Sequence, residues 1–597
     1  MLRRTILATI LIIGLSLPAV TFGKELKGNY DDLLHYTMIG RFDLAKGYAQ
    51  AILDANPEPV ELLELSKANQ QGYALLIKAG ENTAEPQLAA LCKKILDIIE
   101  QGRFTNRADA KIIVEEIKRL SSTSRAKMEA VKRLQNAGEY AIMYMLEALS
   151  DETRKEEMPN ITWAMSRMGR DSVRPLVAAL QTGNVTVKAE IVKALGKIGY
   201  PQSLAYLKYV VEKDGSPELR RLAEDSIKEI DSGAMKSPAS QLFYRLAENY
   251  YYHAESLAPA EDANFANVWF WDAENGRLGR EEVDKRYFNE LMAMRNCEWA
   301  LKADASFGQA IGLWLASYFK AESVGVNMPE FFGQGHADAM TYATTAGPEY
   351  LHQALARAVA DKDASVALGI VEALSTTAGE SSLFYRVGPT QPLAQALSFD
   401  SKAVRYSAAI AVAAAGPKEA FPESKLVVGN LAEAIAQSGE QVVEDSNMWN
   451  AQLADGYALR AAKVLLKLAQ SRNRILDLSL AQSALLAATK DKRPEIQMLA
   501  GHVLAYLNNA AAQNAIAAMA LDENNTQDIR ISGFNSLAVS AQLNANLLNE
   551  AAVDAIYSLV GSKQADAGVR AAAAAAYGAL NLPSQKVKNL ILDQARS

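Results

Sequence analysis

The sequence predicts an all-α protein whose helices stack as an α-α superhelix, or alpha-solenoid. Over residues 171–230, apolar residues recur at helical spacing in short paired runs that are broken by turns rich in Gly and Pro. The pattern repeats: Leu149 and Leu180 hold equivalent places 31 residues apart, and Gly169 and Gly199 each close a second helix, 30 residues apart. A two-helix unit of about thirty residues cannot bury its apolar face alone, so stacking must supply the core.

The first 23 residues have the order of features found in a secretory signal peptide. Arg3 and Arg4 precede an apolar run over 6–17, which is followed by Pro18 and a small-x-small triplet. We therefore expect cleavage before Lys24 and export, either periplasmic or secreted. An uncleaved anchor is the alternative, but the run is shorter than the roughly 20 residues that span a bilayer. Nothing later is long and apolar enough to cross a membrane, so we expect no stable membrane insertion after cleavage.

The charge balance argues against nucleic-acid binding. The chain carries 62 Lys and Arg against 69 Asp and Glu, a formal net charge of −7, whereas a nucleic-acid binder would show a basic excess over one domain. Cys92 and Cys297 both lie in apolar helical patterns. Two distant cysteines do not form a disulfide framework, so we expect two buried thiols.

Residues 24–101 are the first predicted domain after the signal peptide at 1–23, and they consist of paired helices. Gly40, Phe42, Ala45 and Pro57 stand at the spacing of the second helix of a tetratricopeptide repeat, which this stretch resembles. The small side chain of Ala45 would let two helices approach, and Pro57 would end the second helix.

Two further predicted domains, at 102–235 and 346–597, repeat the two-helix pattern. DSVRPLV and SPELRRLA in the first block resemble the start of the second helix in HEAT repeats, where an acidic or hydroxyl residue caps the helix and an Arg follows an aliphatic core residue. In the second block the same pair recurs as Val404-Arg405, Ile529-Arg530 and Val569-Arg570. We expect these arginines to form a ladder with the Asp of the preceding turn. The longest irregular piece, about 416–450, is the expected bend or linker.

Residues 236–345 interrupt the HEAT-like pattern. Three tyrosines at 250–252 are followed by NVWFWDAENGRLGREEV at 267–283. Val, Trp and Phe favour a strand and Asn275-Gly276 is a strong signal for a two-residue turn, so we predict a small β-hairpin insertion near 267–283. Tetratricopeptide-like helices resume at 297–319. Because inserted loops in solenoids fall on one face and often line the binding surface, this insertion is a candidate for function.

The sequence carries no convincing catalytic signature. The five histidines are scattered, and the sequence lacks HExxH, CxxC, an Asp-rich calcium loop, GxxxxGK[ST], GxGxxG after a strand and GxSxG. His336 and Asp338 share a Gly-flexible loop, but two ligands do not make a metal site. We therefore predict a protein that is not an enzyme, with no catalytic residue, cofactor or metal.

Five aromatic residues of the insertion are the candidate partner-binding residues: Tyr250, Tyr251, Tyr252, Trp269 and Trp271. Tyr and Trp offer large rigid contact areas with a polar tip, and they are enriched at protein interfaces and in sugar-stacking sites. The same side chains also serve as packing residues where a hairpin leans on helices. The sequence leaves both uses open.

Over nearly the whole predicted mature chain, the repeat pattern resembles that of exported bacterial proteins that join tetratricopeptide-like and HEAT-like repeats. This resemblance implies a non-catalytic scaffold or adaptor that binds a protein or peptide partner on an extended concave surface. One alternative is a glycan- or cell-wall-binding module that uses the aromatic insertion, and a second is an accessory subunit of an enzyme complex. Polar residues would solvate the last helix, so we expect a capped end and a monomer; these residues are Lys586, Lys588, Asp593 and Arg596.

Overall fold

The computed structural model describes residues 19–259, 265–325, 327–328, 332, 335–377, 379–442, 446, 448–583, 585, 588–589 and 591–592. These residues are mainly helical, with one two-stranded sheet, so the predicted all-α class with a small hairpin is confirmed. Among them, no helix has both the length and the apolar character that a membrane span requires. Most of the predicted signal peptide, 1–18, lies outside the described residues, as do Lys586, Asp593 and Arg596 of the predicted end cap.

The chain divides into two compact units, which we describe separately. Unit 1 comprises residues 1–242 and 253–288, and unit 2 comprises residues 243–252 and 289–597. The division between the units falls inside the predicted 236–345 domain. The finer domain boundaries stay predictions, although one helix, α5 (Pro86–Ala108), runs without a break through the predicted boundary at 101/102.

Unit 1 begins with helices that share one apolar core, which includes Ala45, Ala49 and Ile52, all fully buried. At Gly102, α5 lies directly against the start of α3 (Pro59–Ala68). The approach is so close that a Cβ at this position would clash with the carbonyl oxygen of Pro59. The tetratricopeptide resemblance of this part stays a prediction. The helices are α1 (Ala19–Met38), α2 (Phe42–Asp54), α3, α4 (Gln70–Gly80) and α5.

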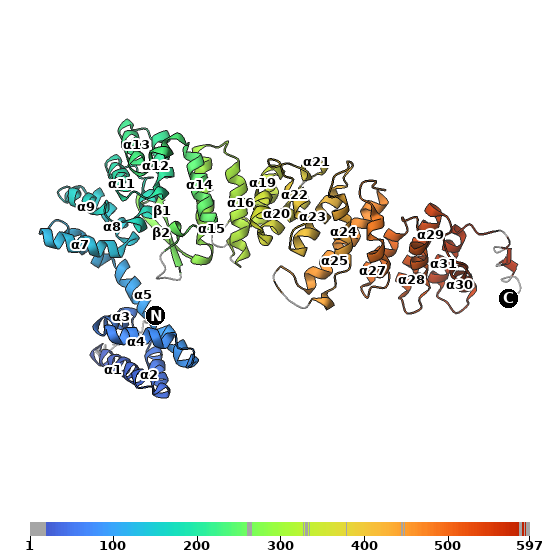
Figure 1. The fold of residues 1–597 in the computed structure, drawn as a ribbon, viewed down its shortest axis with the longest axis horizontal. Coiled ribbons are helices and arrows are strands. Elements are labelled where there is room, and N and C mark those ends of the chain that lie inside the picture. Colours follow the sequence, from blue (N-terminus) through green and yellow to red (C-terminus); the bar gives the residue numbers. More distant parts are fainter. Residues whose placement is uncertain are drawn as a thin grey trace, which may run out of the picture. The chain divides into compact units, whose positions relative to one another are not determined.

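The rest of unit 1 stacks helix pairs, as the period near thirty predicts (Figure 1). Gly169 and Gly199 follow helices and take φ values of +80° and +77°, a conformation that favours glycine. DSVRPLV was predicted to begin a second helix, and this is wrong. It leads into α10, which is the first helix of the pair α10–α11, and Gly199 follows the second helix of that pair. The helices are α6 (Ala110–Arg119), α7 (Ser124–Ala137), α8 (Glu139–Ser150), α9 (Met158–Met165), α10 (Val173–Ala179), α11 (Val185–Ile198), α12 (Leu204–Lys213) and α13 (Pro217–Asp231).

The predicted hairpin is present as strands β1 (Phe265–Asp272) and β2 (Arg277–Asp284), which pair antiparallel with Trp269 opposite Arg280. The turn was predicted to be two residues long, and this is wrong: Asp272 pairs with Arg277, which leaves a four-residue connection. The Asp272 carboxylate accepts hydrogen bonds from the backbone N–H groups of Glu274 and Asn275, both at 3.1 Å. This side chain therefore organises a longer turn, in which Gly276 takes the positive φ of +60°.

Unit 2 is again built from successive packed helices (Figure 1). Helices α14 and α15 each contain a boundary between the units. Short 3₁₀ turns occur in both units, at Glu152–Arg154, Arg170–Ser172, Pro201–Ser203, Ser232–Lys236, Glu255–Leu257, Gly439–Gln441 and Leu478–Ala481. The remaining helices are α14 (Ala239–Tyr251), α15 (Lys285–Ala303), α16 (Gln309–Ser323), α18 (Ala339–Ala346), α19 (Pro348–Asp361), α20 (Ala364–Thr377), α21 (Glu380–Leu383), α22 (Pro392–Ala396), α23 (Lys402–Ala415), α24 (Ser424–Ile435), α25 (Ala451–Gln470), α26 (Gln482–Ala488), α27 (Pro494–Leu504), α28 (Ala510–Leu521), α29 (Gln527–Asn544), α30 (Glu550–Gly561) and α31 (Ala567–Ala579).

The stretch 416–450, predicted to be an irregular bend or linker, contains the regular helix α24. Val427, Leu431 and Ala434 on this helix are fully buried, and α24 packs against both α23 and α25. The prolines and polar residues of this stretch flank the helix rather than replacing it, so α24 is one of the stacked helices.

The predicted arginine ladder takes a different form from the one expected. Arg530 Nε donates to the backbone carbonyl of Ala520 at 3.1 Å, and Arg570 Nη1 donates to that of Ser562 at 3.2 Å. Arg405 also donates to backbone carbonyls in the preceding turn, and it pairs with Glu433 of α24. Carbonyls at a helix C-terminus lack intrahelical donors, and the guanidinium groups supply those donors. The expected pairing with the Asp of the preceding turn is therefore replaced by pairing with backbone carbonyls.

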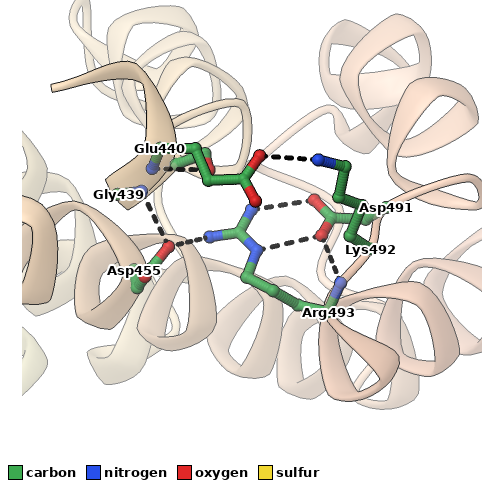
Figure 2. Close-up of polar contacts among 7 residues, drawn as sticks. Gly439, Glu440, Asp455, Asp491, Lys492 and Arg493 are labelled. Carbon is green, nitrogen blue, oxygen red and sulfur yellow. Dashed lines mark hydrogen bonds and ion pairs between the residues drawn. The ribbon is translucent and has the colours of Figure 1, made fainter.

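An Arg–Asp cluster of the kind expected for the ladder occurs instead at Arg493, immediately before α27. Arg493 binds both carboxylate oxygens of Asp491 at 2.8–2.9 Å and one oxygen of Asp455 on α25 at 2.7 Å (Figure 2). Beside it, Lys492 pairs with Glu440 at 2.8 Å. These bonds link α25 to the turn that precedes α27.

Candidate partner-binding site

The hairpin is held to the first block of repeats by the buried carboxylate of Glu139, at the start of α8. Trp269 Nε1 donates to Glu139 Oε2 at 2.8 Å, and Asn267 Nδ2 donates to Glu139 Oε1 at 2.6 Å. Arg174 of α10 lies 3.6 Å from the same carboxylate and is itself 9% exposed. We call Glu139, Tyr140, Arg174, Asn267 and Trp269 the hairpin anchor.

Tyr140 completes the hairpin anchor from the position next to Glu139. Asn267 Nδ2 also contacts the Tyr140 hydroxyl at 2.6 Å, and the Arg280 guanidinium lies 5.1 Å from the Tyr140 ring centroid. Burial, with the nearby Glu139 charge, raises the pKa of Tyr140 to about 12. The phenol therefore remains protonated at neutral pH.

The two candidate tryptophans differ in exposure. Trp269 is buried in the hairpin anchor, whereas Trp271 is half-buried. Their neighbour Phe270 is 45% exposed, and its ring lies over Gly279 of β2, where a Cβ would come within 2.7 Å of the ring. A glycan-stacking platform needs open ring faces, and Trp269 provides none. Trp269 therefore gives no support to the glycan-binding alternative, which stays a prediction for Trp271.

The three candidate tyrosines belong to unit 2 and mainly pack. Tyr250 and Tyr251 are almost completely buried, while Tyr252 is 53% exposed. The Tyr252 hydroxyl accepts a hydrogen bond from Arg357 Nη1 at 2.7 Å and lies 3.2 Å from both carboxylate oxygens of Asp361. Arg357 also donates to Glu248 at 2.6 Å, so these contacts fasten α14 to α19.

The five predicted partner-binding residues thus do not form one group within a unit, since Trp269 and Trp271 lie in unit 1 and the tyrosines lie in unit 2. Their role in partner binding stays a prediction.

A different aromatic residue, which the sequence analysis missed, lies at a surface hollow of unit 1. Half-buried Trp163 of α9 and Lys193 and Lys197 of α11 line a hollow of about 390 Å³, together with Met158, Pro159 and Ala194. We call it the Trp163 hollow. It lies between two consecutive second helices of the stack. A Trp on a second helix with an Arg four residues later, just past the end of that helix, was the available sequence signal.

Two cations hold the indole of Trp163 in place. Lys127 Nζ of α7 lies 4.1 Å from the ring centroid, and the Arg167 guanidinium carbon lies 4.2 Å from it. Lys127 is fixed in turn by a hydrogen bond to Asn160 Oδ1 at 2.6 Å. At the opposite side Glu190 also lines the hollow and pairs with Lys193 at 2.8 Å, while Lys197 pairs with Glu229 at 2.8 Å. The hollow therefore combines an ordered aromatic wall with a rim of paired charges.

Asp338 and the two cysteines, which the sequence raised as candidates for metal or thiol chemistry, lie in separate structural settings. In the described part of the chain, no three His, Cys, Asp or Glu residues gather as metal ligands. Asp338 caps α18 by accepting from the Thr341 N–H at 2.8 Å. Cys92 and Cys297 are free and fully buried, as predicted; burial raises the pKa of Cys92 to about 11 and that of Cys297 well above its ordinary value. Neither thiol is a ready nucleophile at neutral pH.

Residues 142–228 match the family model of HEAT repeats. The predicted HEAT resemblance is therefore confirmed for this stretch, which includes α9, α11 and the Trp163 hollow. No curated protein matches the chain.

Among solved structures, the chain is similar to Kap121p bound to Nup53p, at 15% identity and a TM-score of 0.26, with 95% of this chain and 58% of that chain covered. It is also similar to She4p, at 11% identity and a TM-score of 0.28, with 96% and 88% covered. Importin beta is similar at 10% identity and a TM-score of 0.24, with 97% and 87% covered. The chain thus spans little more than half the length of Kap121p.

Proposed function

We propose that this protein is a non-catalytic interaction scaffold of an exported compartment, and that it binds a peptide segment of a protein partner in the Trp163 hollow. The observation that carries the proposal is the half-buried indole held by Lys127 and Arg167 at a hollow of about 390 Å³. Trp and Arg dominate binding energy at protein interfaces, because a rigid ring and a guanidinium lose little conformational freedom on binding.

The position of the hollow supports a peptide ligand. Consecutive second helices of stacked repeats form the extended surfaces on which such proteins bind their partners. The wall of Met158, Pro159 and Ala194 offers apolar contact. At its edge the Lys193–Glu190 pair offers both a donor and an acceptor to the polar groups of a peptide backbone. One side chain of an extended peptide would fill the space against the indole.

A displayed random-peptide library, selected on the immobilised full chain, tests the proposal. We expect the selected peptides to bind the wild-type protein in calorimetry and to lose at least tenfold in affinity for Trp163→Ala. Lys463→Ala, on the surface of α25 in unit 2, is the matched control and should bind as wild type. Failure to enrich any peptide, or unchanged affinity for Trp163→Ala, would overturn the proposal. Loss in Trp271→Ala with binding retained in Trp163→Ala would move the site to the hairpin.

Export is the second part of the proposal, and it is supported by the charged, apolar and small residues in order over 1–23. We expect the full chain, expressed in a bacterium, to appear outside the cytoplasm with an intact mass that begins at Lys24. A cytoplasmic protein that retains Met1 would refute this part and leave the binding proposal untouched.

A further inference from the structure

A second hollow of unit 1, of about 370 Å³, lies among α3, α5, α6 and α7. Four cationic side chains line it, against one carboxylate: Lys67, Arg103, Arg107 and Arg133, with Glu116. This local excess of positive charge contrasts with the net charge of −7 of the whole chain. We call this hollow the basic groove.

Most of the arginines of the basic groove are held in place by other groups of the protein. Glu116 is 4% exposed and binds Arg133 Nη1 at 2.7 Å and Arg119 Nη1 at 2.9 Å. Lys67 and Arg103 pair in turn with Glu64 at 2.8 Å and Glu100 at 3.1 Å, two carboxylates that do not line the groove. The four lining cations thus still face a single lining carboxylate, and a ligand carboxylate would compete with partly exposed ion pairs. Because Glu116 is fixed in the core, it also orients Arg133 at the rim.

Arg103 and Arg107 lie one helical turn apart on α5. The Arg103 guanidinium is 5.0 Å from the Tyr73 ring centroid, and that of Arg107 is 5.8 Å from the Tyr140 ring centroid. Close packing at Gly102 sets α5 against α3 and brings this pair beside Lys67. The cations are therefore ordered before any ligand arrives, which reduces the entropy lost on binding.

The remaining wall of the basic groove is apolar. Leu63, Ile113 and Leu134 are buried in it, while Ile112 is 44% exposed although it is a large aliphatic residue at the start of α6. A ligand that matches this wall needs an aliphatic side chain as well as carboxylates. A polyanion such as DNA supplies the charge but no aliphatic group.

We propose that the basic groove binds an acidic segment of a partner protein, in which carboxylates meet the four cations and an aliphatic side chain covers Ile112. Charge complementarity identifies this occupant. The inference rests on the proposed scaffold function, but it assigns a second contact of different chemistry from the Trp163 hollow.

Fluorescence anisotropy of a labelled twelve-residue peptide of alternating Glu and Leu, added to the full chain, tests the inference. We expect saturable binding that weakens at least tenfold in Arg103→Glu/Arg107→Glu and severalfold in 0.5 M salt, because charge screening weakens exposed ion pairs. Ile112→Glu should weaken binding to a similar extent. Because Ile112 is 44% exposed and lies outside the buried core, this second variant tests the groove even if the double variant fails to fold.

The matched control is Arg125→Glu/Lys132→Glu on α7, which changes the net charge equally at exposed residues that do not line the groove. It should bind as wild type, and an equal loss would reveal a general charge effect and overturn the inference. Absence of binding to the wild-type protein would overturn it, as would equal binding of the same peptide with Gln in place of Glu, or of single-stranded DNA.

Trp163→Ala separates this inference from the proposed function. It should retain the Glu–Leu peptide while losing the library-selected peptides. If Trp163→Ala loses the Glu–Leu peptide and Arg103→Glu/Arg107→Glu does not, the acidic segment binds in the Trp163 hollow, which overturns the inference and keeps the proposed function.

Discussion

Replacing Glu139 by alanine should release the hairpin from the repeats of unit 1. The change removes the acceptor of the Trp269 and Asn267 hydrogen bonds and the counter-charge of Arg174. Trp269, Asn267 and Arg174 are all 9% exposed or less, so water does not readily replace the lost carboxylate.

The size of the effect follows from these contacts. A hydrogen bond to a charged group contributes about 1.5–3 kcal/mol, and removing one partner of a buried ion pair costs about 3–5 kcal/mol. The contributions share one carboxylate and do not add, so we expect the free energy of hairpin opening to fall by about 3–5 kcal/mol. Trp269→Phe removes one N–H donor to the carboxylate and should have a smaller effect, about 1.5–3 kcal/mol.

Amide hydrogen exchange over residues 265–284 measures this local opening, which a single unfolding midpoint for a two-unit chain would obscure. At about 1.4 kcal/mol for each factor of ten, Glu139→Ala should speed exchange by about two to three and a half powers of ten. Glu147→Ala, at an exposed position of the same helix, is the control and should leave hairpin exchange unchanged. An increase below about tenfold in Glu139→Ala would refute the assigned role of the anchor.

Three further predictions concern packing, pH and charge. Gly196→Ala should destabilise unit 1 by about 1–3 kcal/mol in thermal unfolding, since its Cβ would meet α13 at 2.7 Å, whereas Gly47→Ala, with open space around it, should be neutral or stabilising. Burial lowers the pKa of His352 below its ordinary 6.5, an effect partly offset by a hydrogen bond with a carbonyl. Below about pH 6.5 the imidazole of His352 binds a proton more readily in the unfolded chain than in the folded chain, so the stability of the fold should decrease as the pH drops. The variant His352→Gln should therefore show a smaller drop in Tm between pH 7.5 and 5.5. Arg493→Ala should lower the stability of unit 2 by about 1–2 kcal/mol in denaturant titrations, while Lys492→Ala, at an exposed pair, should change nothing measurable; equal effects would contradict the burial argument.

The repeat architecture could be predicted because it is a local property of the sequence. Gly169 and Gly199 mark positive-φ turns one period apart, and apolar spacing between the turns marks the buried face of each helix. The same locality explains the prediction of the hairpin, since both strands and the turn signal lie within twenty residues of one another.

The polar contacts could not be predicted in the same way, because they depend on which side chains meet in space. Nothing near Trp269 in the sequence indicates that its partner is Glu139, 130 positions earlier. The arginines that follow an aliphatic residue make contacts within the stack, as expected. The acceptors of Arg530 and Arg570, however, are backbone carbonyls, which carry no residue signature. The Trp163 hollow and the basic groove likewise arise from residues on separate helices.

The hairpin anchor also affects the order in which unit 1 can form. During synthesis α8 leaves the ribosome long before Trp269 exists, so the repeats from α8 to α13 must stack while Glu139 still lacks its tryptophan and asparagine donors. Closing so long a loop is a late and slow event compared with the docking of neighbouring helices. A simple stack of repeats can be shortened from its end one repeat at a time. Here a chain that ends before residue 265 would contain every helix from α8 to α13 and still lack the tryptophan and asparagine donors that bind the buried carboxylate of Glu139.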